Sequence, residues 1–289
     1  MSDSSLNISG KIDSATVSTY AAVDEVATSL AVRYVVVGAS ARDIVLHHGH
    51  GAKVQRATAD VDFGIQVPDW GAYEAVKAGL VAKDFTEISR QHRLISSDGT
   101  AIDIVPFGKV ASEGDIIAWP QEGGVKMNIL GFQEACDNAE QVKIQEDPDL
   151  EIPVATPEGM VLLKMIAWTD RIPGERKKDA KDIRYLLETY EKIPAIEIAL
   201  YADQHTMDTY DADLSLAAAH HLGINAAEIA GESTYKFISL LLGDTNNSEH
   251  KAMLTEEMCE QIDREYERNA ALLNALMQGF LRKDKPDNK

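Results

Sequence analysis

Three aspartates and a glycine turn are the residues of this sequence best suited to chemistry. Asp60 and Asp62 stand one residue apart at the start of an apolar run, and Asp103 interrupts a second apolar run over residues 101–105. A third apolar run, upstream of both, ends in Gly38. Carboxylates brought together repel each other at low dielectric, and a hard cation such as Mg²⁺ removes that cost. This combination is typical of sites that transfer nucleotides with Mg²⁺ or Mn²⁺.

The spacing predicts where the carboxylates point. Side chains alternate across a strand, so Asp60 and Asp62 share one face, and Asp103 leaves the core face of its own strand. A lone Asp-x-Asp is more often a solvated strand end, so the metal interpretation depends on the whole combination. The apolar residues between and after the two aspartates, Val61, Phe63, Ile65 and Val67, are expected to face the core.

Gly38 and Ser40 lie where a strand turns into a helix. Glycine permits a tight turn, and the first N–H groups of a helix attract phosphate. Ser40 can donate its hydroxyl to a phosphate oxygen or cap the helix, and a plain strand-to-helix turn is the alternative. The Gly-rich fingerprints of dinucleotide-binding and P-loop proteins are absent from this segment.

The composition limits the class of protein. The chain has 289 residues, a net charge of −19 and a pI near 4.8, which disfavours nucleic-acid binding except at a local basic groove. Two cysteines cannot form a disulfide framework and fit a reducing cytoplasm. Neither a signal peptide nor a membrane-spanning run is evident, so we expect a cytoplasmic protein that does not bind membranes.

The hydrophobic pattern predicts two domains, residues 1–155 and 156–289. Thr156 and Pro157 form a helix start, with a hydroxyl cap followed by proline at the first helical position. The first domain should follow a polar, poorly ordered lead over residues 1–15. It should contain helices at 16–32, 39–48 and 70–83 and strands at 34–37, 61–67, 85–91, 93–97 and 100–106. The second should contain helices at 157–169, 177–191, 195–203, 213–221, 226–231, 234–242 and 255–282.

Two local patterns refine this outline. Asp98-Gly99 is a hairpin signal that should make the strand of Asp103 antiparallel to its predecessor. The histidines of residues 47–51 resemble metal ligands, but we interpret this segment as a surface loop.

A basic stretch opens the second domain. From Lys164 to Arg184 there are seven basic and four acidic residues, a local net charge of +3 in an acidic chain. Lys164 lies in a helix that is apolar nearly all round, so its ammonium needs a partner or must reach a cleft. We expect it to contact phosphate, and we expect Lys178, Asp179 and Asp182 to share a helix face. Three further cations, Arg176, Lys177 and Lys181, are expected to form surface salt bridges.

Together these segments resemble the predicted nucleotidyltransferases of the AbiEii/AbiGii toxin type, within the polymerase-β-like nucleotidyltransferase superfamily. The resemblance covers roughly residues 20–190, and the last hundred residues match nothing known to us. The matching segments are residues 37–43, 56–64, 102–108, 129–135, 163–171 and 178–183. One departure is Ala39, where many family members have a second glycine.

The resemblance implies an α+β fold, with a mixed-sheet nucleotidyltransferase domain followed by a mostly helical domain. It implies that Asp60 and Asp62 hold Mg²⁺, and that Asp103 completes the metal site or acts as the catalytic base. It also implies that nucleoside triphosphate is bound by residues of both domains, namely Gly38, Ser40, Arg42, Arg56, Thr58, Lys164, Lys178 and Asp179. Toxin members transfer nucleotides to RNA ends, tRNA in particular, so an acceptor RNA and a cognate antitoxin are the implied partners.

Three other functions stay open at this point. The same chemistry could act on a small aminoglycoside-like hydroxyl, which an acidic chain suits. A metal-dependent glycosyltransferase also uses Asp-x-Asp, although Ser40 and Asp103 disfavour it. A non-catalytic nucleotide-binding partner, such as an antitoxin or a sensor, is the third alternative.

Overall fold

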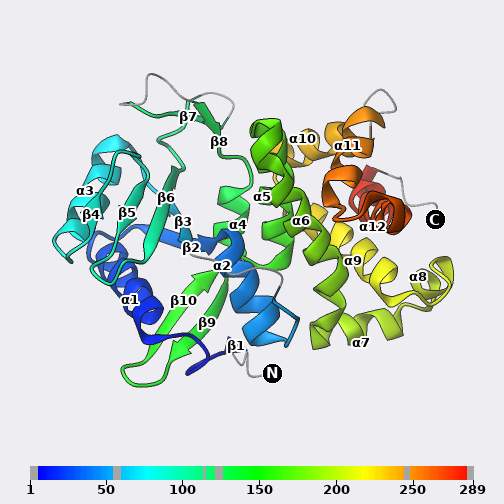
Figure 1. Ribbon diagram of the computed structural model, residues 1–289, viewed down its shortest axis with the longest axis horizontal. Coiled ribbons are helices and arrows are strands. Elements are labelled where there is room, and N and C mark those ends of the chain that lie inside the picture. Colours follow the sequence, from blue (N-terminus) through cyan, green and yellow to red (C-terminus); the bar gives the residue numbers. More distant parts are fainter. Residues whose placement is uncertain (1–5, 55–59, 113–114, 121–125, 244–247, 285–289) are drawn as a thin grey trace. The chain divides into compact units, whose positions relative to one another are not determined.

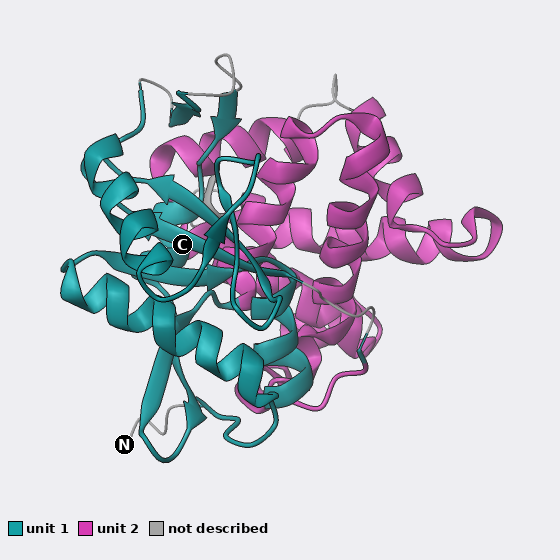
Figure 2. Ribbon diagram, turned by 60° about the vertical axis from the view of Figure 1, so that its left-hand side comes forward, with its two compact units in different colours: residues 1–49, 54–156 teal, residues 50–53, 157–289 magenta. Residues whose placement is uncertain are grey.

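The computed structural model describes residues 6–54, 60–112, 115–120, 126–243 and 248–284 (Figure 1). The chain divides into two compact units, shown in different colours in Figure 2. Unit 1 comprises residues 1–49 and 54–156, and unit 2 comprises residues 50–53 and 157–289. Each unit is described by itself below.

Unit 1 is built on a mixed eight-stranded sheet with the order β1-β9-β10-β2-β3-β6-β5-β4. The central strands β3 and β6 are parallel, whereas β2 and β5 run antiparallel to them on either side. A separate two-stranded sheet joins β7 and β8. The strands are β1 Leu6–Asn7, β2 Arg33–Val37, β3 Asp60–Gln66, β4 Thr86–Glu87, β5 Arg93–Ile95, β6 Ala101–Phe107, β7 Ile116–Ala118, β8 Lys126–Asn128, β9 Glu140–Gln145 and β10 Leu150–Val154.

Among the described residues of unit 1, five helical segments accompany the sheet. They are α1 Ser14–Ser29, α2 Gly38–Arg42, the π-helical segment Asp43–Gly49, α3 Trp70–Val81 and α4 Phe132–Asp137. The prediction of a surface loop at residues 47–51 is partly wrong, because His47 and His48 belong to the π-helical segment. The prediction that residues 1–15 are poorly ordered is also wrong from residue 6 onward, since β1 pairs with β9 and Asp13 caps α1.

The two faces of β3 contact different helices. Phe63 packs edge-on against Tyr20 of α1, with ring centroids 5.9 Å apart, on the apolar face. On the other face, the Gln66 side chain donates a hydrogen bond of 2.8 Å to Gln133 of α4. Asp62 shares this second face, nearer the start of the strand. The predicted alternation of core and carboxylate faces is therefore confirmed.

All the regular secondary structure of unit 2 in the part that the structure describes is helical. No helix of the described residues is long and apolar enough to cross a membrane. The helical unit 2, together with the mixed sheet of unit 1, confirms the expected α+β class. The helices are α5 Pro157–Asp170, α6 Pro173–Thr189, the 3₁₀ turn Tyr190–Lys192, α7 Pro194–Ala202, α8 Gln204–Thr209, α9 Leu214–Ile229, α10 Glu232–Gly243, α11 Ser248–Met258, α12 Ile262–Phe280 and the 3₁₀ turn Leu281–Asp284.

The helices α9 and α12 cross at two glycines. A Cβ atom on Gly223 would lie 2.1 Å from the Leu276 carbonyl oxygen, and one on Gly279 would lie 2.0 Å from the His220 carbonyl oxygen. Only glycine allows the two backbones to approach this closely. This contact explains one wrong expectation, since the predicted helices 213–221 and 226–231 form a single helix through Gly223.

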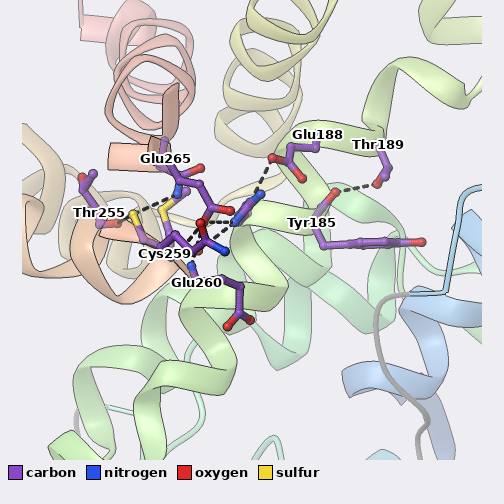
Figure 3. Close-up of polar contacts among 11 residues, drawn as sticks. Tyr185, Glu188, Thr189, Thr255, Cys259, Glu260 and Glu265 are labelled. Carbon is purple, nitrogen blue, oxygen red and sulfur yellow. Dashed lines mark hydrogen bonds and ion pairs between the residues drawn. The ribbon is translucent and has the colours of Figure 1, made fainter. Parts of the chain in front are cut away.

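The expected helix 255–282 is in fact two helices with a break after Met258. At the break, the carboxylate of Glu265 accepts hydrogen bonds from the backbone N–H groups of Glu260 and Gln261, at 2.7 and 3.3 Å. The same carboxylate pairs with Arg184 of α6 at 2.7 Å (Figure 3). A charged side chain thus satisfies the backbone N–H groups just before α12, and α6 holds it in place.

The glycine crossing predicts the sign of two substitutions. Alanine normally stabilises a helix relative to glycine by about 1 kcal/mol. For Gly223→Ala and Gly279→Ala, we expect the opposite, a loss of about 1–3 kcal/mol in the free energy of unfolding, because the new methyl group would meet a backbone carbonyl. Urea denaturation measures this change.

Gly174 of α6 is the matched control, because a Cβ there would meet nothing within 4 Å. Gly174→Ala should leave stability unchanged or raise it. Equal effects at all three positions would contradict the close crossing of α9 and α12.

Candidate active site

Two of the three aspartates face each other across neighbouring strands. In the parallel register of β3 and β6, Asp62 lies opposite Asp103, while Asp60 lies opposite Ala101. The side chain of Asp60 is 40% exposed, and that of Asp103 is 15% exposed. The structure therefore brings together the carboxylates that the sequence pattern singled out, near the start of both strands.

Gly38 approaches this cluster from the end of β2, where Val37 lies opposite Asp62. Its φ angle is +71°, and a Cβ atom at this position would lie 2.0 Å from the Asp62 carboxylate oxygen Oδ2. Glycine is therefore needed for two reasons, the left-handed backbone and the contact with the carboxylate. The turn predicted from the sequence is confirmed, and its role in binding phosphate stays a prediction.

Ser40 lies within α2 and does not cap it. Its hydroxyl donates to the carbonyl of Val37 at 3.3 Å. The N-cap of α2 is Val37, which makes no side-chain capping bond, so the alternative of Ser40 as N-cap is wrong. Burial raises the pKa of the Tyr20 phenol, so this hydroxyl stays protonated.

Three further residues of unit 1, Arg42, Arg56 and Thr58, were expected to contact the nucleotide. Arg42 is buried, with its side chain 2% exposed, and it pairs with Asp43 through its Nε and Nη2 atoms at 2.9 and 2.7 Å. The structure therefore does not present Arg42 on the surface for a nucleotide contact. Arg56 and Thr58 lie outside the described residues, and their roles stay predictions.

The sequence analysis missed Arg93, whose guanidinium lies between two of the carboxylates. Its Nε and Nη2 atoms donate to both oxygens of Asp103, at 2.6 and 2.5 Å. The same Nη2 also donates to Oδ2 of Asp60 at 2.7 Å. Hydrogen bonding to Asp103 raises the pKa of Arg93, which is charged at any physiological pH. A protein cation thus relieves part of the repulsion expected among the aspartates.

A signal for Arg93 was present in the sequence. The Asp98-Gly99 turn closes a hairpin between β5 and β6, and the antiparallel pairing predicted from it is confirmed. Counting outward from the turn pairs Ile95 with Ala101 and Arg93 with Asp103. The turn therefore placed an arginine directly across from the third aspartate.

The donor set fits a divalent cation held by two carboxylates. Mg²⁺ typically takes one or two protein carboxylates together with substrate phosphates, and Asp60 and Asp62 share one face of β3. Asp103 differs, because both of its oxygens accept hydrogen bonds from Arg93. Within the described ranges, no three Asp, Glu, His or Cys side chains form a group able to hold a metal. The structure thus does not show the expected three-carboxylate set, and the metal itself stays a prediction.

A cavity of about 280 Å³ lies beside Asp60 within unit 1. Its lining includes Tyr20, Ser40, Asp60 and Thr100. Asp60 is therefore accessible to a ligand while it bonds to Arg93.

In unit 2, Lys164 pairs with two buried carboxylates. Its Nζ atom lies 3.1 Å from Oδ1 of Asp179 and 2.8 Å from Oδ2 of Asp182, and Arg171 lies 3.1 Å from the other oxygen of Asp179. Asp179 and Asp182 are almost fully buried, whereas Lys178 is exposed. The expectation that these three share one face is therefore wrong for Lys178. The partner that a buried ammonium requires is supplied within the unit.

The three cations that were expected to form surface salt bridges divide into two groups. Arg176 pairs with Glu257 at 2.8 Å and lies over the ring of Trp168, and Lys181 pairs with Glu260. The predicted salt bridges are therefore confirmed for Arg176 and Lys181. Lys177, like Lys178, is exposed.

The comparison with solved structures gives distant matches. The antibiotic-resistance factor ANT(2'')-Ia is 13% identical, with a TM-score of 0.34 over 69% of this chain and 98% of that chain. A nucleotidyltransferase-like protein from Paracoccidioides brasiliensis is 14% identical, with a TM-score of 0.37 over 66% and 89% of the two chains. The CCA-adding enzyme of Thermotoga maritima, complexed with tRNA, is 12% identical, with a TM-score of 0.26 over 95% and 82%. At this level of similarity the matches say nothing about the substrate.

No curated protein matches the chain. A family model does, that of the nucleotidyl transferase AbiEii toxin of type IV toxin–antitoxin systems, over residues 25–277. The match extends far beyond residue 190, so the expectation that the last hundred residues resemble no known family is wrong. This chain belongs to the AbiEii nucleotidyl transferase toxin family.

Proposed function

We propose that this protein transfers a nucleoside monophosphate from a nucleoside triphosphate to an acceptor hydroxyl, with Mg²⁺ or Mn²⁺ as cofactor. The observation that carries the proposal is the juxtaposition of Asp62, Asp103 and Gly38. Two carboxylates meet in register, and the glycine turn packs directly against one of them. Membership of a nucleotidyltransferase family supports the same chemistry.

In this reaction the acceptor oxygen forms a bond to the α-phosphorus while the bond to pyrophosphate breaks. Pyrophosphate leaves with the electron pair, and the hydroxyl proton passes to solvent. Asp60 and Asp62 are the residues that would hold the cation, which supplies positive charge to the triphosphate. Gly38 lets the Asp62 carboxylate pack against the turn that would bind the triphosphate, and Arg93 adds a fixed positive charge.

We infer that the acceptor is an RNA end, as the toxin family suggests, and that the protein acts as a toxin with a cognate antitoxin. The direct test is incubation of the purified protein with each labelled triphosphate, Mg²⁺ and either total RNA or a panel of aminoglycosides. Labelled RNA supports the proposal. Labelling of an aminoglycoside with none in RNA would favour the small-molecule alternative, and tight binding of a nucleotide-sugar in place of triphosphates would favour a glycosyltransferase.

Removing the charge of Asp62 tests the site itself. In the wild-type protein, Mg²⁺ with triphosphate should raise the melting temperature by mass action. Asp62→Asn should abolish that rise while the protein remains folded, because one of the two cation ligands becomes neutral. Differential scanning fluorimetry measures both quantities.

The control is Asp84→Asn, a change of the same kind at an exposed position after α3. Asp84 has a φ angle of +66°, which asparagine tolerates well. This variant should retain the full ligand-induced rise. A rise that persists in Asp62→Asn would contradict the assignment of the site.

The exposed lysines of α6 test the choice of acceptor. Lys178→Glu and Lys177→Glu should reduce RNA modification far more than triphosphate binding, because each removes a cation that can contact RNA phosphate. Each should also lower the salt slope of RNA binding by about 1. Arg176 is unsuitable for this purpose, since it pairs with Glu257.

Lys236→Glu, at an exposed position of α10, is the matched charge reversal. It should leave RNA modification close to the wild-type level. If all three reversals leave it unchanged, this basic stretch does not bind RNA.

The Lys164 pairs predict a stability effect that must be separated from any phosphate contact. Lys164→Ala should lower the free energy of unfolding by about 3 kcal/mol, because it leaves two buried carboxylates without their shared cation. Lys181→Ala, which removes a partly exposed pair, should cost less than about 1 kcal/mol. Similar losses in urea denaturation would contradict a structural role for Lys164. Triphosphate binding by Lys164→Ala is informative only where the variant is folded.

A further inference from the structure

The position of Arg93 suggests how many metal ions the site takes. One guanidinium bonds to both oxygens of Asp103 and to one oxygen of Asp60, at 2.5–2.7 Å. In two-metal sites a second ion, about 3.5–4 Å from the first, adds further positive charge. Arg93 therefore already supplies positive charge between Asp60 and Asp103.

The backbone holds Arg93 in this position. It is the direct cross-strand partner of Asp103 in the antiparallel pair of β5 and β6. The hairpin that sets this register is closed by Ser96, whose hydroxyl accepts from the Thr100 backbone N–H at 3.0 Å. The arginine side chain is 21% exposed, so protein surrounds most of it. Its contacts thus follow from the strand register and do not depend on a freely mobile side chain.

The charges favour retention of Arg93 over its replacement by a second ion. A bidentate arginine–carboxylate pair combines two charge-assisted hydrogen bonds in one fixed geometry. A cation bound to Asp103 would compete with both bonds, and displacing them would leave the partly buried guanidinium with only its bond to Asp60, which is costly. Asp60 gives only one oxygen to Arg93, and its side chain borders the cavity.

We propose that Arg93 is a built-in cation of this site, so that the protein holds one divalent ion, through Asp60 and Asp62, where a two-metal site would hold two. Asp103 then positions Arg93 and is neither a metal ligand nor the proton acceptor. This inference rests on the proposed function, because the single ion is the one that accompanies the triphosphate.

The test counts metal ions. The full-length protein is equilibrated by dialysis with Mn²⁺ and, in turn, the α,β-methylene analogue of each of the four ribonucleoside triphosphates, which cannot be cleaved at the bond that reacts. The ratio of bound Mn²⁺ to bound nucleotide is then measured. We expect one ion per nucleotide in the wild type and also in Asp103→Asn, since Asp103 is not a ligand.

Variants of Arg93 should change this count. Arg93→Gln releases Asp103 and should raise the ratio to two, and the double variant Arg93→Gln with Asp103→Asn should return it to one. Arg93→Lys retains the positive charge and should stay at one. Arg90→Gln is the matched control, because Arg90 is an exposed arginine three residues away, and its ratio should equal that of the wild type.

The outcomes separate this inference from the proposed function. Two ions in the wild type, or a count that falls to zero in Asp103→Asn, would overturn the role of Arg93 alone. An unchanged ratio of one in folded Arg93→Gln would also overturn it. If the wild type retains neither Mn²⁺ nor nucleotide, the proposed function fails, and the inference fails with it. The wild-type count decides even if Arg93→Gln does not fold.

Discussion

The candidate site depends on one electrostatic constraint, the need to hold carboxylates side by side on neighbouring strands. The parallel register of β3 and β6 places Asp62 opposite Asp103, and repulsion at this position would oppose the strand pairing. Arg93 on the adjacent strand relieves it by bonding to Asp103 and Asp60. Strand order, hairpin register and charge pairing are therefore parts of one arrangement. In this arrangement Asp60 keeps an accessible side that a ligand can contact.

The same principle governs the helical unit, with a different outcome. Lys164 and Arg171 compensate the buried carboxylates of Asp179 and Asp182, so the pairing holds α5 and α6 together. The basic stretch is consequently less available to a polyanion than its net charge implies. Its exposed members include Lys177 and Lys178, and the acceptor hypothesis depends on them.

Local pattern predicted those features that depend on neighbours in the chain. Strand alternation placed Asp62 correctly, and the hairpin signal gave the direction of the strand that carries Asp103. Features that depend on distant contacts could not be read in this way. Gly223 resembles a helix break because its close contact with α12 is invisible in sequence, and Lys178 appeared to share a face with Asp179 because helical spacing alone does not show which side is buried. Arg93 lies between these cases, since the hairpin register placed it opposite Asp103 but its bond to Asp60 requires the folded sheet.

The central claim is that a protein cation and a single metal ion share the carboxylates of this site. The most direct measurement is anomalous diffraction from crystals grown with Mn²⁺ and a non-hydrolysable triphosphate. We predict one manganese peak against Asp60 and Asp62, with Arg93 still bonded to Asp103. Two peaks, or a manganese ion bound to Asp103 with Arg93 displaced, would contradict the account.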